Sequence, residues 1–333
     1  MAPLPSVDNP YGHDVPAVLR GLYGVGGADD LSARLRDYLR GAHGIVDGIV
    51  ERVHIAHGLA AFVRADAAHF VLKLSPEPAG SLAILIDRLM GLRRAGVPLP
   101  RIHRRLDGSW TGRPLPGVGD EAYLMDVVPG VPPDRWNAAR AAATARALAE
   151  LHRQGDDAPH QPGAPGLLDA DLAEDREAIA ELTGAGLVRA GVADRAIDAV
   201  ARWSGDEGFE RCHIHGDARL CHFLFEGDGL QAMIDIEQGG WGHRARDVAF
   251  HAVSHPDPAR TAFLSREAIV GWVGRYDRLM PFTPTERRGL PDVLAFVAMA
   301  ELAGSFGNHR TGRSDVTDAD LRRGTALVEA LTT

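Results

Sequence analysis

The chain has 333 residues, of which 45% are hydrophobic and 24% are charged, and its net charge is −9. This composition is typical of a globular protein with enough material for one large domain or two lobes. The negative charge argues against a nucleic-acid partner, because a phosphate backbone requires a basic surface, and it weakly favours a neutral or cationic small substrate.

Two cysteines, Cys212 and Cys221, are too few for a disulfide framework, so a reducing, cytoplasmic location is expected. The first residues lack the basic-then-apolar pattern of a signal peptide. The longest apolar segment, around Leu294–Gly304, is shorter than a membrane span and contains Glu301. We therefore expect no membrane contact, and a monomer or a homodimer.

Residues 1–128 form the first predicted lobe, a small antiparallel sheet accompanied by helices. Helical periodicity predicts helices at Val15–Leu22, Leu31–Ala42 and Leu82–Arg94. Apolar runs between turn residues predict strands at Ile49–Ala56, Ala60–Arg64, His69–Leu74, Arg101–Leu106 and Ala122–Val128. The first three of these strands fit a meander with short turns.

Residues 129–333 form the second predicted lobe, which is mostly helical. The segment Pro129-Gly130-Val131-Pro132-Pro133 disfavours regular structure, so we place the boundary between the lobes there. Helices are predicted at Ala138–His152, Leu168–Leu182, Val192–Trp203, Asp247–Val253, Arg266–Leu279, Pro291–Gly304 and Asp318–Leu331. The predicted fold class is α+β, with a small sheet lobe and a larger helical lobe.

The segment His213–Asp247 interrupts the helices with short apolar strands and polar turns. Asp217 follows the first apolar run, and Asp235 follows a second run that a hairpin would place beside it. Carboxylates at strand ends suit metal binding or proton abstraction better than they suit a hydrophobic core. We interpret this hairpin as the chemical centre of the protein.

Lys73 is the only lysine among 36 basic residues, and it lies in the strand-like run His69–Leu74. Arginine and lysine replace each other on most solvated surfaces, but not where a compact charge on a flexible stem is required. The alternative is that Lys73 remains by chance. Its position on a strand favours a function.

Three motifs follow Lys73 in order: His215-Gly216-Asp217, Ile234-Asp235-Ile236-Glu237 and Arg246-Asp247-Val248-Ala249. With them, the chain from about Ile49 to Ala249 resembles the aminoglycoside phosphotransferase and choline kinase group of small-molecule kinases. The resemblance implies a protein-kinase-like fold of two lobes. It also implies ATP-dependent transfer of the γ-phosphate to a hydroxyl group of a small molecule, a reaction in which the protein supplies positioning and charge.

The resemblance also implies roles for individual residues. Nucleotide, ATP or GTP, would be bound by Lys73, His57, Gly58 and the backbone of Met125, Asp126, Val127 and Val128. Asp217 would accept the proton of the attacking hydroxyl, and Asp235 would hold Mg²⁺. His215 and Asp247 would support the catalytic loop, although Asp247 also reads as an ordinary acid at a helix N-terminus.

Three features depart from the family pattern. His222 stands where the family has asparagine, and an imidazole suits Mn²⁺ or Zn²⁺ better than Mg²⁺. The helix after Lys73 lacks the glutamate that normally pairs with the lysine, and Asp87 is the nearest helix acid. No G-x-G-x-x-G motif is present, which leaves the His57-Gly58 turn as the phosphate loop.

The acceptor is expected to lie against the C-terminal helices, with Glu237, Trp241, Arg244 and Glu301 as candidate contacts. An antibiotic, an amino alcohol, a sugar and a nucleoside all remain open as acceptors. One alternative function is a kinase-like protein with impaired catalysis. Another is a zinc-dependent hydrolase that uses His213, His215 and Asp217, although Ala218 occupies the last position of the corresponding metal box.

Overall fold

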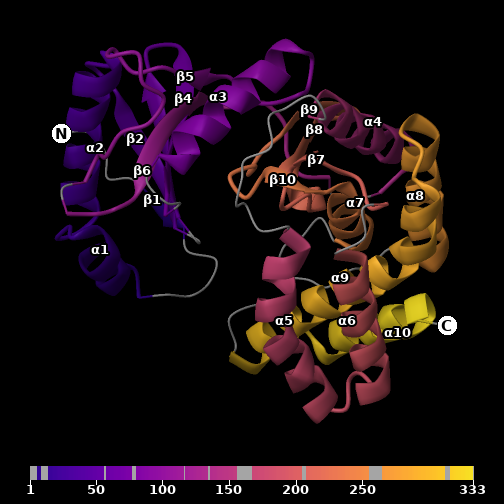
Figure 1. Ribbon diagram of the computed structural model, residues 1–333. Coiled ribbons are helices and arrows are strands. Elements are labelled where there is room, and N and C mark those ends of the chain that lie inside the picture. Colours follow the sequence, from indigo (N-terminus) through magenta and orange to yellow (C-terminus); the bar gives the residue numbers. More distant parts are fainter. Residues whose placement is uncertain are drawn as a thin grey trace. The chain divides into compact units, whose positions relative to one another are not determined.

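A computed structural model describes residues 6–8, 14–55, 58–76, 80–115, 117–133, 136–155, 167–204, 208–254, 265–311 and 316–332. The chain divides into two compact units, Met1–Val128 and Pro129–Thr333 (Figure 1). The first combines a sheet with helices, and the second is mostly helical, so the α+β fold class is confirmed.

The first unit contains a six-stranded sheet with the order β1-β2-β3-β4-β6-β5. Its strands are β1 (Ser6–Asp8), β2 (Ile49–Ile55), β3 (Leu59–Ala65), β4 (Ala68–Ser75), β5 (Ile102–His103) and β6 (Glu121–Asp126). Its helices are α1 (Val15–Tyr23), α2 (Ala28–His43) and α3 (Ser81–Arg94). The predicted meander is β2–β4, which pair antiparallel. The structure adds β1, a strand that was not predicted, and it pairs parallel to β2.

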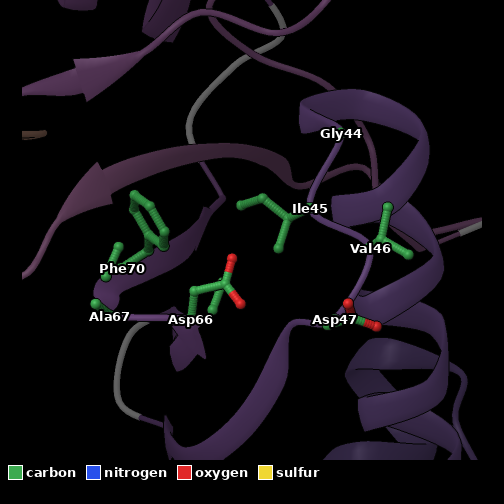
Figure 2. A pocket seen from close by; sticks show the side chains of 9 residues that line it. Gly44, Ile45, Val46, Asp47, Asp66, Ala67 and Phe70 are labelled. Carbon is green, nitrogen blue, oxygen red and sulfur yellow. The ribbon is translucent and has the colours of Figure 1, made fainter.

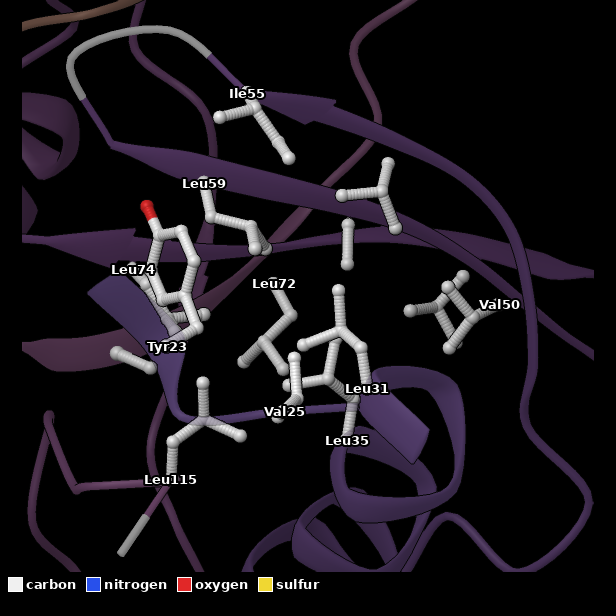
Figure 3. Packing of buried hydrophobic residues seen from close by; sticks show 14 of the residues in the cluster. Tyr23, Val25, Leu31, Leu35, Val50, Ile55, Leu59, Leu72, Leu74 and Leu115 are labelled. Carbon is white, nitrogen blue, oxygen red and sulfur yellow. The ribbon is translucent and has the colours of Figure 1, made fainter. Parts of the chain in front are cut away.

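Alternation along β4 separates the two faces of this sheet. Leu72 and Leu74 are buried in a core that also contains leucines of α2, among them Leu31 and Leu35 (Figure 3). Lys73 lies between those two leucines in the sequence and therefore projects from the opposite face of the sheet. The same hydrophobic core that holds the sheet thus directs the lysine away from it.

A separate hollow of about 660 Å³ lies between the loop after α2 and the turn between β3 and β4 (Figure 2). Its lining residues are Gly44, Ile45, Val46, Asp47, Ala65, Asp66, Ala67, Ala68 and Phe70. None of the residues predicted to bind nucleotide lies among them. We therefore do not assign this hollow to the nucleotide.

The second unit carries two short ribbons among seven helices described in the structure. The strands are β7 (Arg211–Ile214) paired with β10 (Gly240–His243), and β8 (Phe223–Glu226) paired with β9 (Gly229–Met233). The helices are α4 (Ala138–Gln154), α5 (Leu167–Gly184), α6 (Ala190–Ser204), α7 (Arg244–Val253), α8 (Arg266–Leu279), α9 (Pro284–Thr311) and α10 (Asp318–Thr332). Each predicted helix of this lobe is present.

Helix α9 packs against α5, α6, α7 and α10 and is the central helix of this unit. It begins seven residues before the predicted start, because Thr283 and Glu286 form a capping box. The Glu286 N–H donates to Thr283 Oγ1 at 3.0 Å, and the Thr283 N–H donates to Glu286 Oε2 at 2.8 Å. By length and composition α9 is also able to cross a membrane, but 67% of its apolar window is buried inside the unit, as in a core helix.

Candidate active site

Asp217 and Asp235 lie on either side of one imidazole, that of His222. His222 Nδ1 donates to the backbone carbonyl of Asp217 at 2.8 Å and lies 3.8 Å from Asp217 Oδ2. His222 Nε2 lies 3.2 Å from Asp235 Oδ2. The hairpin of β8 and β9 creates this arrangement, because the Ile234 N–H donates to the His222 carbonyl at 2.8 Å just before Asp235.

The surroundings of His222 favour the protonated form of its imidazole. Burial alone would lower its pKa, but the Cys221 side chain and the carboxylates of Asp217 and Asp235 outweigh burial and raise the pKa to about 10. Both ring nitrogens face oxygen atoms, as expected for an imidazolium that donates on each side. The His222 side chain is 14% exposed and that of Asp235 is 42% exposed, so a ligand can reach the pair from the Asp235 side.

Two backbone positions in this region are unusual. Asp235 has a φ of 64°, a left-handed conformation that is uncommon for a residue other than glycine and is typical of functional sites. Gly216 has a φ of 86°, and a Cβ atom there would lie 2.1 Å from the carbonyl oxygen of Gln238. Glycine is therefore required before Asp217, so that the loop at residues 215–220 can pack against the loop between β9 and β10.

Asp247 at the start of α7 fixes the backbone on which Asp217 sits. Its fully buried carboxylate accepts from the His215 N–H at 2.5 Å, the Gly216 N–H at 3.0 Å and His152 Nε2 at 3.0 Å. Burial raises its pKa, but the hydrogen bond and charge of His152 and the bond from His215 outweigh that effect and lower it. Arg246 donates to the carbonyl of Gly216, so Gly216 is held through both its N–H and its carbonyl.

A second buried network holds the next part of the loop. His251 Nδ1 donates to the carbonyl of Ala218 at 3.0 Å, and its Nε2 lies 2.9 Å from Thr144 Oγ1. Trp272 Nε1 also donates to Thr144 Oγ1, at 3.0 Å. The Leu220 N–H donates to Ser254 Oγ at 2.8 Å. Helices α4, α7 and α8 thus position residues 215–220 through hydrogen bonds.

The buried imidazole of His251 predicts that the folded protein loses stability in acid. Burial lowers the pKa of His251 to about 3, against 6.5 for an exposed histidine. Below pH 6.5 the unfolded chain therefore binds a proton that the folded protein excludes, so stability falls as the pH falls from 6.5 towards 3. One such group contributes at most about 1.4 kcal/mol per pH unit.

The variant His251→Asn keeps an N–H group for the Ala218 carbonyl but has no titratable ring. We expect its free energy of unfolding, measured by urea titration between pH 6 and pH 4, to fall less steeply than that of the wild type. His215, whose pKa burial also lowers, and Asp247 contribute to the remaining slope. Equal slopes in the two proteins would show that His251 is not the group responsible.

Arg244 is buried in an ion-pair network, which argues against its prediction as an acceptor contact. Its side chain is 1% exposed, and Nε donates to Glu286 Oε1 at 2.8 Å. Its Nη2 pairs with Glu210 Oε2 at 2.8 Å and donates to the Pro281 carbonyl at 2.9 Å. These contacts join the start of α7 to the residue before β7 and to the start of α9, so the role of Arg244 is structural.

The other candidate acceptor contacts have different settings. Glu301 on α9 accepts from Arg219 Nη2 at 2.8 Å, and its side chain is 12% exposed. Trp241 is half-buried on β10, opposite His213 on β7, and Glu237 is half-buried in the loop after β9. Glu301 is thus connected to Asp217 through Arg219, an arginine that no sequence motif indicated.

The residues predicted for nucleotide binding lie in the first unit. Lys73 is half-buried on β4, between Ala60 on β3 and Tyr123 on β6. A Cβ atom on Gly58 would lie 2.5 Å from the carbonyl oxygen of Leu74, so glycine is required where this turn approaches β4. His57 lies outside the described residues. The carboxylate of Asp87, the nearest helix acid, accepts from Trp110 Nε1 at 3.0 Å and pairs with Arg104 at 3.3 Å.

The segment from Met125 to Val128 ends β6. The Asp126 N–H donates to the carbonyl of Arg101, and the Val127 N–H donates to the carbonyl of His69, each at 3.0 Å. The Asp126 carboxylate also lies 2.6 Å from His103 Nε2. Two of the backbone donors in this segment are therefore already used within the sheet.

The described residues combine a lysine on a sheet strand, a strictly positioned H-G-D loop and a second aspartate beside it. Together these features define the class of small-molecule phosphotransferases. The chain belongs to the phosphotransferase enzyme family, whose sequence profile matches residues 54–282. This match confirms the resemblance and the prediction of an enzyme of the small-molecule kinase type. No curated protein sequence matches the chain significantly.

Solved structures show the same fold at low sequence identity. A microcompartment-associated aminopropanol kinase matches with a TM-score of 0.59 and 15% identity, over 90% of this chain and 95% of its own. An amicoumacin kinase in complex with AMP-PNP and Ca²⁺ matches with a TM-score of 0.58 and 11% identity, over 84% and 86%. A spectinomycin phosphotransferase in complex with ADP and spectinomycin matches with a TM-score of 0.54 and 11% identity, over 90% and 97%.

The zinc-hydrolase alternative receives no support from these findings. Among the residues that the structure describes, no three or more His, Cys, Asp or Glu side chains gather as a metal site. His213 lies buried on β7, and His215 Nδ1 accepts from the Asp217 N–H at 3.3 Å. His213 is therefore a buried residue of β7, and His215 holds the backbone of the loop that follows it.

Proposed function

We propose that this protein transfers the γ-phosphate of ATP or GTP to a hydroxyl group of a small molecule in the cytoplasm. The observation that carries the proposal is the placement of Asp217 and Asp235 around His222, on a loop held by buried hydrogen bonds. Phosphoryl transfer requires mainly positioning and charge, and a fixed loop supplies both.

Asp217 accepts the proton of the attacking hydroxyl in this proposal. The acceptor O–H bond breaks, a bond forms between that oxygen and the γ-phosphorus, and the bond from phosphorus to the β-phosphate oxygen breaks. The proton goes to the Asp217 carboxylate, and the nucleoside diphosphate leaves. Gly216 and Asp247 contribute by fixing the backbone of the base, since an error of about 1 Å in its position costs roughly a hundredfold in rate.

Asp235 and His222 would hold a divalent metal ion, which supplies positive charge to the phosphates when bound. The donor set fits a metal, because a carboxylate oxygen and an imidazole nitrogen lie 3.2 Å apart at a partly exposed position. An imidazole donor suits Mn²⁺ better than Mg²⁺. His222 must first lose the proton that faces Asp235, so metal binding should release protons near neutral pH.

Lys73 would bind the α- and β-phosphates, and the turn at His57 and Gly58 would lie over them. For the base of the nucleotide, the Val128 N–H is the donor we assign within Met125–Val128. The N–H groups of Asp126 and Val127 are used within the sheet, and Pro129 has none. The neighbour structures with ADP and with AMP-PNP and Ca²⁺ support the use of a nucleotide and a divalent metal.

We favour an amine-bearing alcohol as acceptor, either an amino alcohol or an aminated antibiotic. The net charge of −9 supports a cationic acceptor, and the similar structures include an aminopropanol kinase. The experiment is a screen of phosphate transfer from ATP and GTP to amino alcohols, aminoglycosides, sugars and nucleosides, with Mg²⁺ and with Mn²⁺. Thermal stabilisation by a nucleotide–metal pair should accompany transfer, and its absence with every pair would refute the proposal.

The second candidate is a kinase-like protein that binds nucleotide but transfers phosphate poorly. The observation in its favour is the pairing of His222 with Asp235, because a charged imidazole competes with a metal ion for that carboxylate. Nucleotide-dependent stabilisation without transfer to any acceptor, under either metal, would favour this candidate.

Replacing His222 by Asn should change the metal preference. The amide restores an oxygen donor that Mg²⁺ accepts and removes the competing positive charge, so we expect the ratio of the Mg²⁺-supported to the Mn²⁺-supported rate to rise by roughly tenfold. Steady-state rates at saturating concentrations of each metal give this ratio. An unchanged ratio would mean that His222 does not contribute to the metal site.

A further inference from the structure

Arg219 follows Asp217 by two residues and bridges two carboxylates. Its Nε lies 3.2 Å from Asp217 Oδ1, and its Nη2 donates to Glu301 Oε1 at 2.8 Å. These two nitrogens form one edge of the planar guanidinium, the edge that usually binds a single carboxylate with two parallel bonds. Here Nη2 makes a hydrogen bond to the glutamate from α9, whereas Nε makes a charge contact with the predicted base that lacks hydrogen-bond geometry.

The backbone around Arg219 is fixed on both sides. The carbonyl of Ala218 accepts from His251, and the N–H of Leu220 donates to Ser254, so α7 holds the residue before and the residue after. The Arg219 carbonyl accepts from the His222 N–H at 2.9 Å. The direction in which the Arg219 side chain leaves the loop is therefore determined by the same network that positions Asp217.

The Arg219 side chain is more exposed than the two carboxylates that hold it. The Arg219 guanidinium lies 5.9 Å from the ring centre of Phe250, and the Arg219 side chain is 34% exposed. The Asp217 and Glu301 side chains are 14% and 12% exposed. Two shielded carboxylates on one guanidinium make a fixed arrangement, which differs from a mobile ion pair on the surface.

We propose that Arg219 is a positioning residue for phosphoryl transfer: braced by Glu301, it holds the Asp217 carboxylate in the orientation that accepts the acceptor's proton. This inference rests on the proposed function and adds to it. Asp217 Oδ1 contacts Arg219, so Oδ2 is the oxygen that takes the proton. Glu301 is engaged by Arg219, so it acts on the base through the arginine and not as a direct ligand of a cationic acceptor.

The test begins with the wild-type protein, its best acceptor and the better of the two metals. Arg219→Gln should lower kcat by roughly a hundredfold, because the base loses its orientation. The KM for nucleotide should change by less than about twofold, because Arg219 is not assigned to nucleotide binding. Arg219→Lys should recover part of the rate, since it keeps the charge without the planar fork.

Glu301→Gln should lower kcat less than Arg219→Gln, and the double variant should be no slower than Arg219→Gln alone, because both changes act through one contact. Free guanidinium ion added to Arg219→Ala should restore part of the activity, which a merely structural role would not allow. The matched control is Arg310→Gln, which removes an exposed ion pair between the same helix α9 and Glu181 and should leave kcat unchanged.

The outcomes separate the inference from the proposed function. If the wild type transfers phosphate and Arg219→Gln has the same kcat, Arg219 is not a positioning residue. The inference would also be overturned if the losses in kcat were additive in the double variant. It would be overturned too if the fall in kcat of Arg219→Gln were explained by unfolding of the variant at the assay temperature. If the wild type transfers phosphate to no acceptor but is stabilised by nucleotide, the proposed function fails. In that case the inference fails with it, because there is no transfer step in which Arg219 could position the base.

Discussion

Asp217→Asn should abolish phosphate transfer and leave nucleotide binding intact. The amide cannot accept the proton of the attacking hydroxyl, so we expect a fall in kcat of roughly 10³-fold or more. The nucleotide contacts are assigned to other residues, so the shift in melting temperature on adding nucleotide and metal should equal that of the wild type. Single-turnover rates and thermal melts measure the two effects separately.

The Asp217→Asn substitution should change the chemistry of the side chain without disturbing the backbone of the loop. The backbone of residue 217 is held through its own N–H and carbonyl, to His215 and His222, and neither bond uses the side chain. The variant should therefore fold with the loop in place. Retained turnover would remove Asp217 as the base, and a lost nucleotide shift would show that the carboxylate serves binding instead.

Asp247→Asn should destabilise the second unit more than any surface substitution. The Asp247 carboxylate accepts three hydrogen bonds in a fully buried position, and an amide nitrogen would face one of those donors. Breaking a buried charge network from one side costs about 3 to 5 kcal/mol. Urea denaturation at neutral pH measures this loss.

A matched control is Asp228→Asn, which changes an acid that pairs with Arg140 but is 57% exposed. The Asp228 carboxylate is screened by solvent, and Arg140, whose side chain is 10% exposed, keeps its hydrogen bond to the Gly227 carbonyl at 3.0 Å. We therefore expect a loss of about 1 kcal/mol or less and an unfolding midpoint close to that of the wild type. If Asp247→Asn were as stable as Asp228→Asn, the catalytic loop would not depend on Asp247 for its position.

The positions of the helices and strands could be predicted from periodicity and turn residues, because these are local properties. The error at α9 had a local cause as well, since Thr283-Pro284-Thr285-Glu286 has the spacing of a capping box. The parallel pairing of β1 could not be predicted in this way. A three-residue strand carries too little periodicity to indicate its partner.

The residues of the candidate site that belong to a sequence motif could be predicted. The ion-pair partners of nearby arginines could not, because they come from distant parts of the chain. Asp217, Asp235 and His222 stand in a recognisable order, so their proximity could be expected. The environment of Arg244 depends on Glu286, which lies 42 residues away, and the pairing of Arg219 with Glu301 spans 82 residues. A charged residue near a motif therefore cannot be assigned to a substrate before its partners are known.

The position of Lys73 has a practical consequence for labelling chemistry. It is the only side-chain amine of the chain, and it lies half-buried between β3 and β6 on the sheet face opposite the leucine core. Reagents that acylate amines therefore find one lysine in the entire protein, at the residue proposed to bind nucleotide phosphates. Such reagents report on occupancy of that position without interference from other lysines, and amine coupling to a surface risks blocking it.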